Sequence, residues 1–170
     1  MKIIDNFLPE DEFKIIQDTF LNDEFPWFLT PFKIQKIENR NSELNELYNF
    51  QFTHNLYSQF SPKSLHIETV NSILLRLNPS ALIKIKANLT PITNDIVTYG
   101  YHTDSDSTTS YTGVYYLNSN NGVTLFEDGN TVESVANRML IFNSALKHSG
   151  TSCTDQKVRC VINFNFYKWE

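Results

Sequence analysis

The sequence predicts an α+β fold in which N-terminal helices pack on one sheet of a sandwich or jelly roll. Apolar residues recur at helical spacing near the N-terminus, then alternate at strand spacing after about Pro79, where turn-forming residues interrupt them. Many short strands joined by turns are typical of a sandwich or jelly roll. Since no repeat, low-complexity tract or linker is visible, residues 1–170 are expected to form one domain, mainly helical over 1–78 and with its β core over 79–170.

The first predicted helix runs from Pro9 to about Asn22. Pro9 suits the first helical position, and the three acidic residues that follow it suit the positive end of the helix dipole. Its apolar face would consist of Phe13, Ile16, Phe20 and Leu21.

A second helix is predicted from Ser42 to about Phe60, with Ser42 as its cap. Between the two helices, the aromatic segment Phe25-Pro26-Trp27-Phe28 is interpreted as core packing rather than as a ligand site. The inward residues of the second helix would be Leu44, Leu47, Tyr48 and Leu56.

The strands of the second half are predicted from alternating or short apolar runs. Turns are expected at Asn120-Asn121-Gly122 and at Glu127-Asp128-Gly129-Asn130, because these residues favour tight turns. The expected strands are Leu82–Ala87, Thr112–Leu117, Met139–Phe142 and Val158–Phe166.

Composition narrows the class of protein. Hydrophobic residues make up 41% of the chain and aromatic residues 14%, which indicates a packed globular protein. The net charge of -5 comes without a basic stripe, so no nucleic-acid partner is expected, although one or two cations could still bind a small anion. No signal peptide or membrane-spanning stretch is visible, and a cytoplasmic protein is expected. Cys153 and Cys160 could pair, but two free thiols fit that compartment better.

A candidate metal site begins at His102 and Asp104. Residues two apart in a strand point to the same face, which sets an imidazole beside a carboxylate. The best third donor is His148, just after an apolar strand, and two histidines with one carboxylate form the ligand set of non-heme Fe(II) oxygenases. Alone, the His-x-Asp pattern is weak, since His102 could bond a loop and Asp104 could begin an Asx-turn.

Arg159 strengthens the candidate site. It lies on the final predicted strand, on the face opposite Val158 and Cys160, and its planar fork suits a carboxylate. An exposed strand arginine is the plain alternative. The ordered set of His102, Asp104, His148 and Arg159 is much harder to obtain by chance than any single member.

The stretch from about Arg76 to Phe166 resembles the 2-oxoglutarate/Fe(II) dioxygenase superfamily, in particular its prolyl 4-hydroxylase-like branch. The helical N-terminal part looks like that of small bacterial and phage members. The matching motifs are Leu82–Leu89, His102-Thr103-Asp104, Val114–Asn118, Asn121–Phe126, Asn137–Phe142, His148-Ser149-Gly150 and Arg159.

The resemblance implies a double-stranded β-helix, with His102, Asp104 and His148 as Fe(II) ligands. Arg159 would bind the C5 carboxylate of 2-oxoglutarate. Tyr116 would contact the same carboxylate, with a role as a core aromatic residue weighed equally. The implied reaction uses O2, releases succinate and CO2, and hydroxylates a substrate, with ascorbate as a candidate reductant. Asp104 argues against halogenation, because halogenating relatives lack this carboxylate.

The substrate stays open among a peptidyl proline, a free amino acid and another small molecule. Two rival functions are a cupin-like metalloprotein that does not use 2-oxoglutarate and a non-catalytic jelly-roll binding module. Substrate contacts are expected from residues 90–97 and 105–110, beside the mouth. His54 and His66 are interpreted as surface or hydrogen-bonded histidines. For the alternating residues Lys84, Lys86 and Asn88, a solvated face is preferred over a pocket role.

Overall fold

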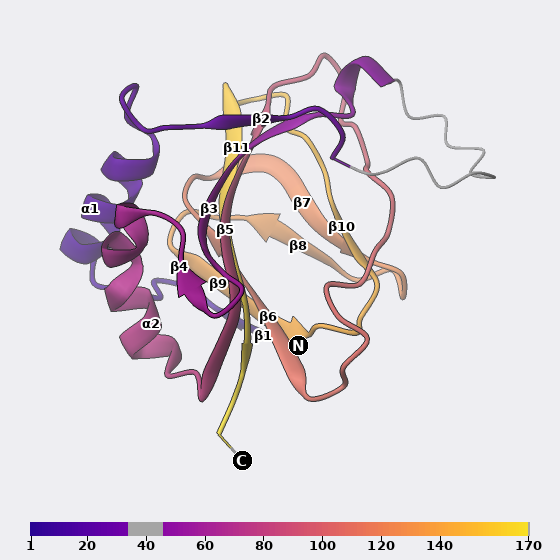
Figure 1. Cartoon of the computed structure of the whole chain (residues 1–170). Coiled ribbons are helices and arrows are strands. Elements are labelled where there is room, and N and C mark those ends of the chain that lie inside the picture. Colours follow the sequence, from indigo (N-terminus) through magenta and orange to yellow (C-terminus); the bar gives the residue numbers. More distant parts are fainter. Residues whose placement is uncertain (34–45, 170) are drawn as a thin grey trace.

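The computed structural model describes residues 1–33 and 46–169, and in this part of the chain two antiparallel sheets face each other (Figure 1). The larger sheet has the order β1-β9-β6-β11-β5-β3-β2, with β4 paired to β3, and the smaller has the order β10-β7-β8. The strands of the larger sheet are β1 (Lys2–Ile4), β9 (Arg138–Asn143), β6 (Ser110–Tyr116), β11 (Val158–Tyr167), β5 (Ala81–Pro91), β3 (Gln51–Ser58), β2 (Phe28–Thr30) and β4 (Ser61–Pro62). Those of the smaller sheet are β10 (His148–Gly150), β7 (Asn120–Phe126) and β8 (Thr131–Ser134).

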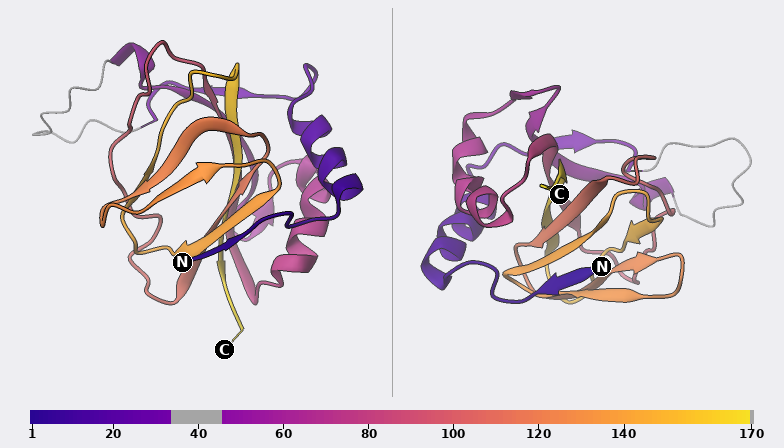
Figure 2. Two further views of the ribbon diagram at one scale, coloured as in Figure 1. Left: turned by 180° about the vertical axis from the view of Figure 1, so that it is seen from behind. Right: turned by 90° about the horizontal axis from the view of Figure 1, so that it is seen from below.

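Two α-helices, α1 and α2, cover the outer face of the larger sheet (Figures 1 and 2). Helix α1 spans Glu10–Phe20, inside the predicted range, and buries Phe13, Ile16 and Phe20 against the sheet. Pro9 is its cap, with an extended ψ of 147°, rather than its first helical residue. The other helix, α2 (Asn71–Leu77), continues from the 3-10 helix η2 (Leu65–Val70). The prediction that a helix over about 9–22 packs on one sheet is therefore confirmed, while α2 was not predicted.

The predicted second helix is wrong over the residues that the structure describes. Its residues 42–45, with the proposed cap Ser42 and inward Leu44, lie outside the described residues. From there the chain forms a short 3-10 turn, η1 (Glu46–Tyr48), and then strand β3. β3 pairs with β2 on one side and β5 on the other, so its backbone groups are satisfied in the sheet. Leu56 is buried as predicted, whereas Leu47 is 78% exposed.

The strands predicted for the second half are confirmed within β5, β6, β9 and β11. The turn at Glu127-Asp128-Gly129-Asn130 is also present, with Gly129 at a φ of 90° that suits glycine. The turn predicted at Asn120-Asn121-Gly122 is wrong, because the chain bends at residues 117–118 instead. Residues 120–122 begin strand β7, where the pairing with β8 is irregular.

Two apolar clusters hold the layers together. One lies between the helices and the larger sheet, and the other lies between the two sheets. Strand β11 contributes to both, since Ile162 and Phe164 enter the first cluster and Val161 enters the second. Cys153 and Cys160 are buried free thiols. None of the helices in the described part of the chain is long and apolar enough to cross a membrane.

Candidate metal centre and cavity

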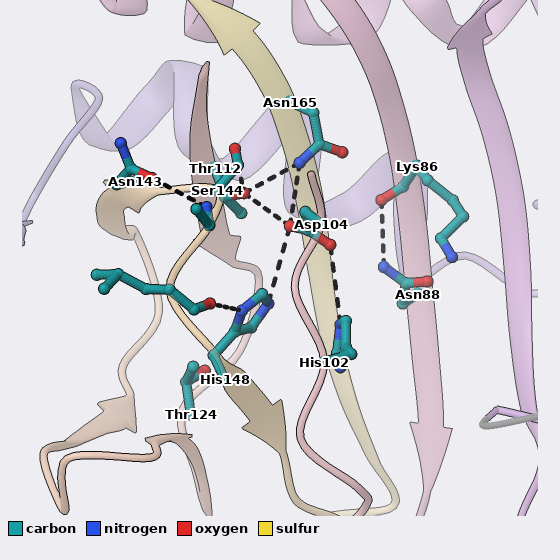
Figure 3. Close-up of polar contacts among 12 residues, drawn as sticks. Lys86, Asn88, His102, Asp104, Thr112, Thr124, Asn143, Ser144, His148 and Asn165 are labelled. Carbon is teal, nitrogen blue, oxygen red and sulfur yellow. Dashed lines mark hydrogen bonds and ion pairs between the residues drawn. The ribbon is translucent and has the colours of Figure 1, made fainter. Parts of the chain in front are cut away.

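The structure brings His102, Asp104 and His148 together at one end of the space between the sheets. One ligand-type atom from each lies within 4.8 Å of the other two, and Figure 3 shows the three side chains pointing toward one another. The Nε2 atoms of His102 and His148 each lie 3.8 Å from an oxygen of Asp104. A single ion can therefore be reached by two imidazoles and one carboxylate.

Backbone pairing positions the two histidines. His102 and His148 form a β-bridge, with reciprocal N–H to carbonyl bonds of 3.0 and 2.9 Å, so the segment before Asp104 lies along β10. The Nδ1 atom of His148 lies 2.9 Å from the carbonyl oxygen of Leu146. Because a carbonyl only accepts hydrogen bonds, Nδ1 carries the proton and Nε2 keeps a lone pair for a metal. Phe142 packs edge-on against this ring at 4.7 Å.

Asp104 is held by the larger sheet. Its Oδ2 accepts hydrogen bonds from Thr112 Oγ1 at 2.7 Å and from Asn165 Nδ2 at 3.0 Å (Figure 3). Its backbone N–H donates to the carbonyl oxygen of Ser144 at 3.1 Å. These three residues were missed from the sequence. Of the three, only Asn165 could have been identified from the sequence, because its spacing places it on the same face of strand β11 as Arg159.

The environment favours the neutral form of His102. Burial lowers the pKa of this imidazole, and the neighbouring His148 lowers it further, against the opposing effect of Asp104. Its side chain is nevertheless 54% exposed, whereas that of Asp104 is 17% exposed. A neutral imidazole is the form that donates to a metal, so the pKa shift suits a ligand.

A cavity of about 150 Å³ opens beside the three residues and reaches Arg159. Arg159 is 5% exposed, and burial lowers the pKa of its guanidinium. Its Nε donates to Ser134 Oγ at 2.9 Å and its Nη2 to Thr124 Oγ1 at 3.1 Å. Within residues 1–33 and 46–169, no carboxylate pairs with this arginine. A buried cation without a counter-charge favours an anionic ligand.

Tyr116 lies next to this arginine but does not line the cavity. Its hydroxyl bonds Thr124 Oγ1 at 2.7 Å, and the guanidinium carbon of Arg159 lies 5.6 Å from its ring centre. When Thr124 accepts from both Arg159 and Tyr116, its own hydroxyl proton is left to donate into the cavity.

Two glycines leave the room that Arg159 occupies. A Cβ atom on Gly122 would lie 2.7 Å from the Cδ of Arg159 and 2.5 Å from the backbone oxygen of Ser152. A Cβ on Gly150 would lie 3.2 Å from Nη1 of the same arginine. Larger residues at these positions would therefore displace the guanidinium.

The polar residues of strand β5 face the cavity, since Lys84, Lys86, Asn88 and Thr90 all line it. The prediction of a solvated face is therefore wrong for Asn88, which is buried, and for Lys86, which is half-buried, whereas Lys84 is exposed. The sequence showed correctly that these residues alternate along the strand. It did not show that their face points into the cavity, because polar side chains are usually solvent-exposed. Lys33 was missed altogether. Its Nζ bonds Thr90 Oγ1 at 2.9 Å, and burial followed by the charge of Arg159 lowers its pKa.

The other residues that the sequence singled out lie apart from the group of His102, Asp104 and His148, which is called the metal cluster below. Thr90 lines the cavity, but no other residue of 90–97 does, and none of residues 105–110 does. His54 is buried, bonds the carbonyl oxygen of Pro26 at 2.7 Å, and packs with His66 around Phe25. Phe25 itself is buried, as predicted for the aromatic segment, while Phe28 is 61% exposed.

The family model described as the 2OG-Fe(II) oxygenase superfamily matches residues 88–167. This segment holds His102, Asp104, His148 and Arg159, so the resemblance to this superfamily that was identified from the sequence is confirmed. The superfamily implies Fe(II) and 2-oxoglutarate, and the two histidines and one aspartate are consistent with the metal. None of the proteins with curated descriptions matches the chain.

Solved structures of prolyl hydroxylases share the fold. A prolyl hydroxylase from Trichoplax adhaerens, solved with a peptide fragment of hypoxia inducible factor, is 14% identical over 98% of this chain and 83% of its own, with a TM-score of 0.63. A prolyl-4-hydroxylase from Pseudomonas putida is 16% identical over 99% and 92%, with a TM-score of 0.57. The non-heme α-ketoglutarate-dependent epimerase SnoN of nogalamycin biosynthesis is 14% identical over 98% and 77%, with a TM-score of 0.64. At these identities the likeness shows an antiparallel, β-rich fold with few helices.

Proposed function

We propose that this protein is a non-heme Fe(II) and 2-oxoglutarate-dependent dioxygenase that hydroxylates a peptidyl proline, an amino acid or another small molecule. His102, Asp104 and His148 would hold the metal. The observation that carries the proposal is their cluster, within 4.8 Å, at a cavity that also contains the buried Arg159. When bound, Fe(II) and 2-oxoglutarate supply the activation of O2, with release of succinate and CO2.

The residues around the cluster would fix the ligands before the metal arrives. The bond from His148 Nδ1 to Leu146 selects the tautomer, and Thr112 and Asn165 leave one Asp104 oxygen free of hydrogen bonds from these residues. His102, Asp104 and His148 would hold the metal from one side, and the cavity beside them would admit the co-substrate. Hydroxylation, rather than halogenation, follows from a carboxylate among the ligands.

Arg159 would pair with the C5 carboxylate of 2-oxoglutarate, and Thr124 would donate its hydroxyl proton to the same group. Tyr116 would act on that carboxylate through Thr124, to which its hydroxyl is bonded. Arg159 is buried and pairs with no carboxylate of the described residues, which argues against a cupin-like protein that does not use 2-oxoglutarate. The cluster of His102, Asp104 and His148 argues against a binding module without a metal. Ascorbate as a reductant stays part of the proposal.

The two facing sheets would form the double-stranded β-helix of the superfamily, within one domain spanning residues 1–170. The bridges that join Thr98 to Thr151 and His102 to His148 support this assignment, because they extend the smaller sheet by one further segment.

An oxygen-free titration of 2-oxoglutarate into the Fe(II)-loaded protein tests the proposal, followed by measurement of succinate in air with candidate peptides and amino acids. We expect 2-oxoglutarate to bind only when metal is present, and His102→Ala to abolish both binding and succinate release. His66→Ala is the control, because His66 lies outside the cavity. Equal 2-oxoglutarate binding with and without metal would contradict the proposal.

A further inference from the structure

The lysines of strand β5 lie at the metal end of the cavity. In the pairing of β5 with β11, Thr90 lies opposite Arg159, Lys86 opposite Asn163, and Lys84 opposite Asn165. Asn165 is the residue that bonds Asp104. With a rise of about 3.3 Å per residue, Lys86 lies about 13 Å along the strand from Thr90. The lysine pair is therefore separated from Arg159 and is close to the metal cluster.

Lys86 lines the same cavity as His102, Asp104 and His148. Burial lowers the pKa of its ammonium, and the charge of Lys84 lowers it further, while Asp104 acts in the opposite direction. Figure 3 shows Lys86 and Asn88 beside the cluster. Among the described residues, no acidic side chain forms an ion pair with Lys84 or Lys86.

The lysines are not needed to balance the charges of the proposed cofactors. The two negative charges of 2-oxoglutarate and that of Asp104 would balance Fe(II) and Arg159. Lys84 and Lys86 also line the cavity, so its described walls keep an excess of positive charge. This excess occurs in a protein whose net charge is -5. Such a local cationic pocket attracts an additional anion.

Polar acceptors accompany the lysines. The Oδ1 atoms of Asn88 and Asn163 are buried and have no hydrogen-bond partner among the described residues, and both residues line the cavity. Asn88 is 7% exposed. Buried acceptors without partners favour a ligand that brings N–H or O–H groups.

We propose that the primary substrate carries a carboxylate or phosphate group that binds Lys86, with Lys84 beside it, while its reacting carbon lies at the metal cluster. This inference rests on the function proposed above, because it takes Arg159 and the metal as the sites of 2-oxoglutarate. It selects a small acidic substrate from the classes that the fold leaves open. N–H or O–H groups of that substrate would donate to Asn88 and Asn163.

Calorimetric titration of the Fe(II)- and 2-oxoglutarate-loaded protein, without oxygen, tests this inference with matched probes. One arm compares L-amino acids with their carboxamides, and the other compares sugar phosphates with the parent sugars. We expect charged members of one arm to bind and their neutral partners to bind at least about 10-fold more weakly, because the neutral partners lose a charge-assisted contact. The binding arm identifies the anion as a carboxylate or a phosphate.

Variants assign the effect to the lysine. Lys86→Gln should weaken binding of the charged probes about 10-fold, whereas Lys86→Arg should retain most of it. Lys63→Gln, at an exposed lysine outside the cavity, is the matched control. Three results would overturn the inference: equal binding of neutral probes, equal binding by Lys86→Gln, or no millimolar binding of any charged probe. A Lys86→Gln variant that lost 2-oxoglutarate affinity alone would assign the lysine to the co-substrate instead.

The same titrations separate this inference from the proposed function. If 2-oxoglutarate fails to bind the wild-type protein but the charged probes still depend on Lys86, the co-substrate assignment fails and the anion site stands. If 2-oxoglutarate binds through Arg159 and the probes ignore Lys86, the oxygenase assignment stands and the anion site fails.

Discussion

At the scale of single residues, Asn165 links the metal cluster to the larger sheet. Its amide donates to Asp104 Oδ2 and to Thr112 Oγ1, each at 3.0 Å. Removal of this support should let the carboxylate rotate, and Asn165→Ala is expected to weaken metal binding about 10–100-fold. Metal titration measures the change, with Asn55→Ala at an exposed position of β3 as control. Unchanged metal affinity would mean that Thr112 alone fixes Asp104.

Arg159 is the residue on which co-substrate affinity should depend most. Arg159→Ala is expected to weaken 2-oxoglutarate binding by about 2–5 kcal/mol, because a buried charge pair loses one partner. Metal affinity should stay nearly the same. Arg159→Lys should lose less, since it keeps the charge and loses only the planar fork. Calorimetry gives both affinities, with metal titrated into the metal-free protein and 2-oxoglutarate into the metal-loaded protein. Arg76→Ala, at an exposed arginine on α2, serves as control. An Arg159→Ala variant with wild-type affinity would refute the assignment.

Metal loading should depend on pH through the histidine ligands. Imidazoles donate only when neutral, so loading is expected to be complete near neutral pH and to be lost as the pH falls below about 6.5. Burial and His148 lower the pKa of His102, which moves this loss toward lower pH. More iron should move it lower still, because the metal competes with the proton.

Acid unfolding is the alternative cause of such a loss. A histidine whose folded-state pKa is lowered binds a proton more readily when unfolded, so the metal-free protein also loses stability as the pH falls. Metal occupancy and circular dichroism followed together at two iron concentrations separate the two. A midpoint that does not move with iron concentration would show that the histidines are not ligands.

At the scale of elements, strand β11 separates the site from the helical layer. Arg159, Asn163 and Asn165 line the cavity on one face, while Ile162 and Phe164 are completely buried in the apolar cluster on the other. Phe164→Ala should therefore lower the free energy of unfolding by about 3–5 kcal/mol. Asn163→Ala should change it much less, because the Oδ1 of Asn163 has no hydrogen bond to lose.

Urea denaturation measures both variants of β11. Equal losses of stability from the two substitutions would mean that the strand does not divide into an apolar face and a ligand face. The neighbouring strand β5 has the same division, with Ile85 and Ala87 in the core and Lys84, Lys86 and Asn88 at the cavity. The two strands together form one wall of the site.

At the scale of the whole molecule, the metal cluster joins the two sheets. His148 begins β10 of the smaller sheet, whereas Asp104 is bonded to Thr112 and Asn165 of the larger one. A ligand that binds this cluster must therefore stabilise both sheets. At a metal concentration of 100 times its dissociation constant, folding should gain about 2.7 kcal/mol, or about 5–10 °C in Tm.

Scanning calorimetry without oxygen measures this stabilisation. Addition of 2-oxoglutarate should raise the Tm further in the metal-loaded protein and not in Arg159→Ala. A 2-oxoglutarate effect of the same size in the metal-free protein would contradict a co-substrate that bridges the metal and Arg159.

The sequence alone was sufficient to predict those features that depend on local interactions or on a motif. Helix α1 follows from its acidic first turn and apolar spacing, and β11 from strict alternation. The order of His102, Asp104, His148 and Arg159, together with the strand motifs around them, predicted the resemblance to the superfamily whose model matches residues 88–167.

The tertiary structure decided what depends on distant partners. Gln51–Ser58 contains apolar residues that fit a helix, yet pairing with β2 and β5 makes it a strand. The alternation of Lys84, Lys86 and Asn88 was visible, but only the packing of β5 between β11 and β3 sets those side chains in the cavity. Thr112 and Asn165 reach Asp104 across separations of 8 and 61 residues. Hydrogen bonds of this kind leave no periodic pattern, because they are set by strand order and register rather than by neighbours in the chain.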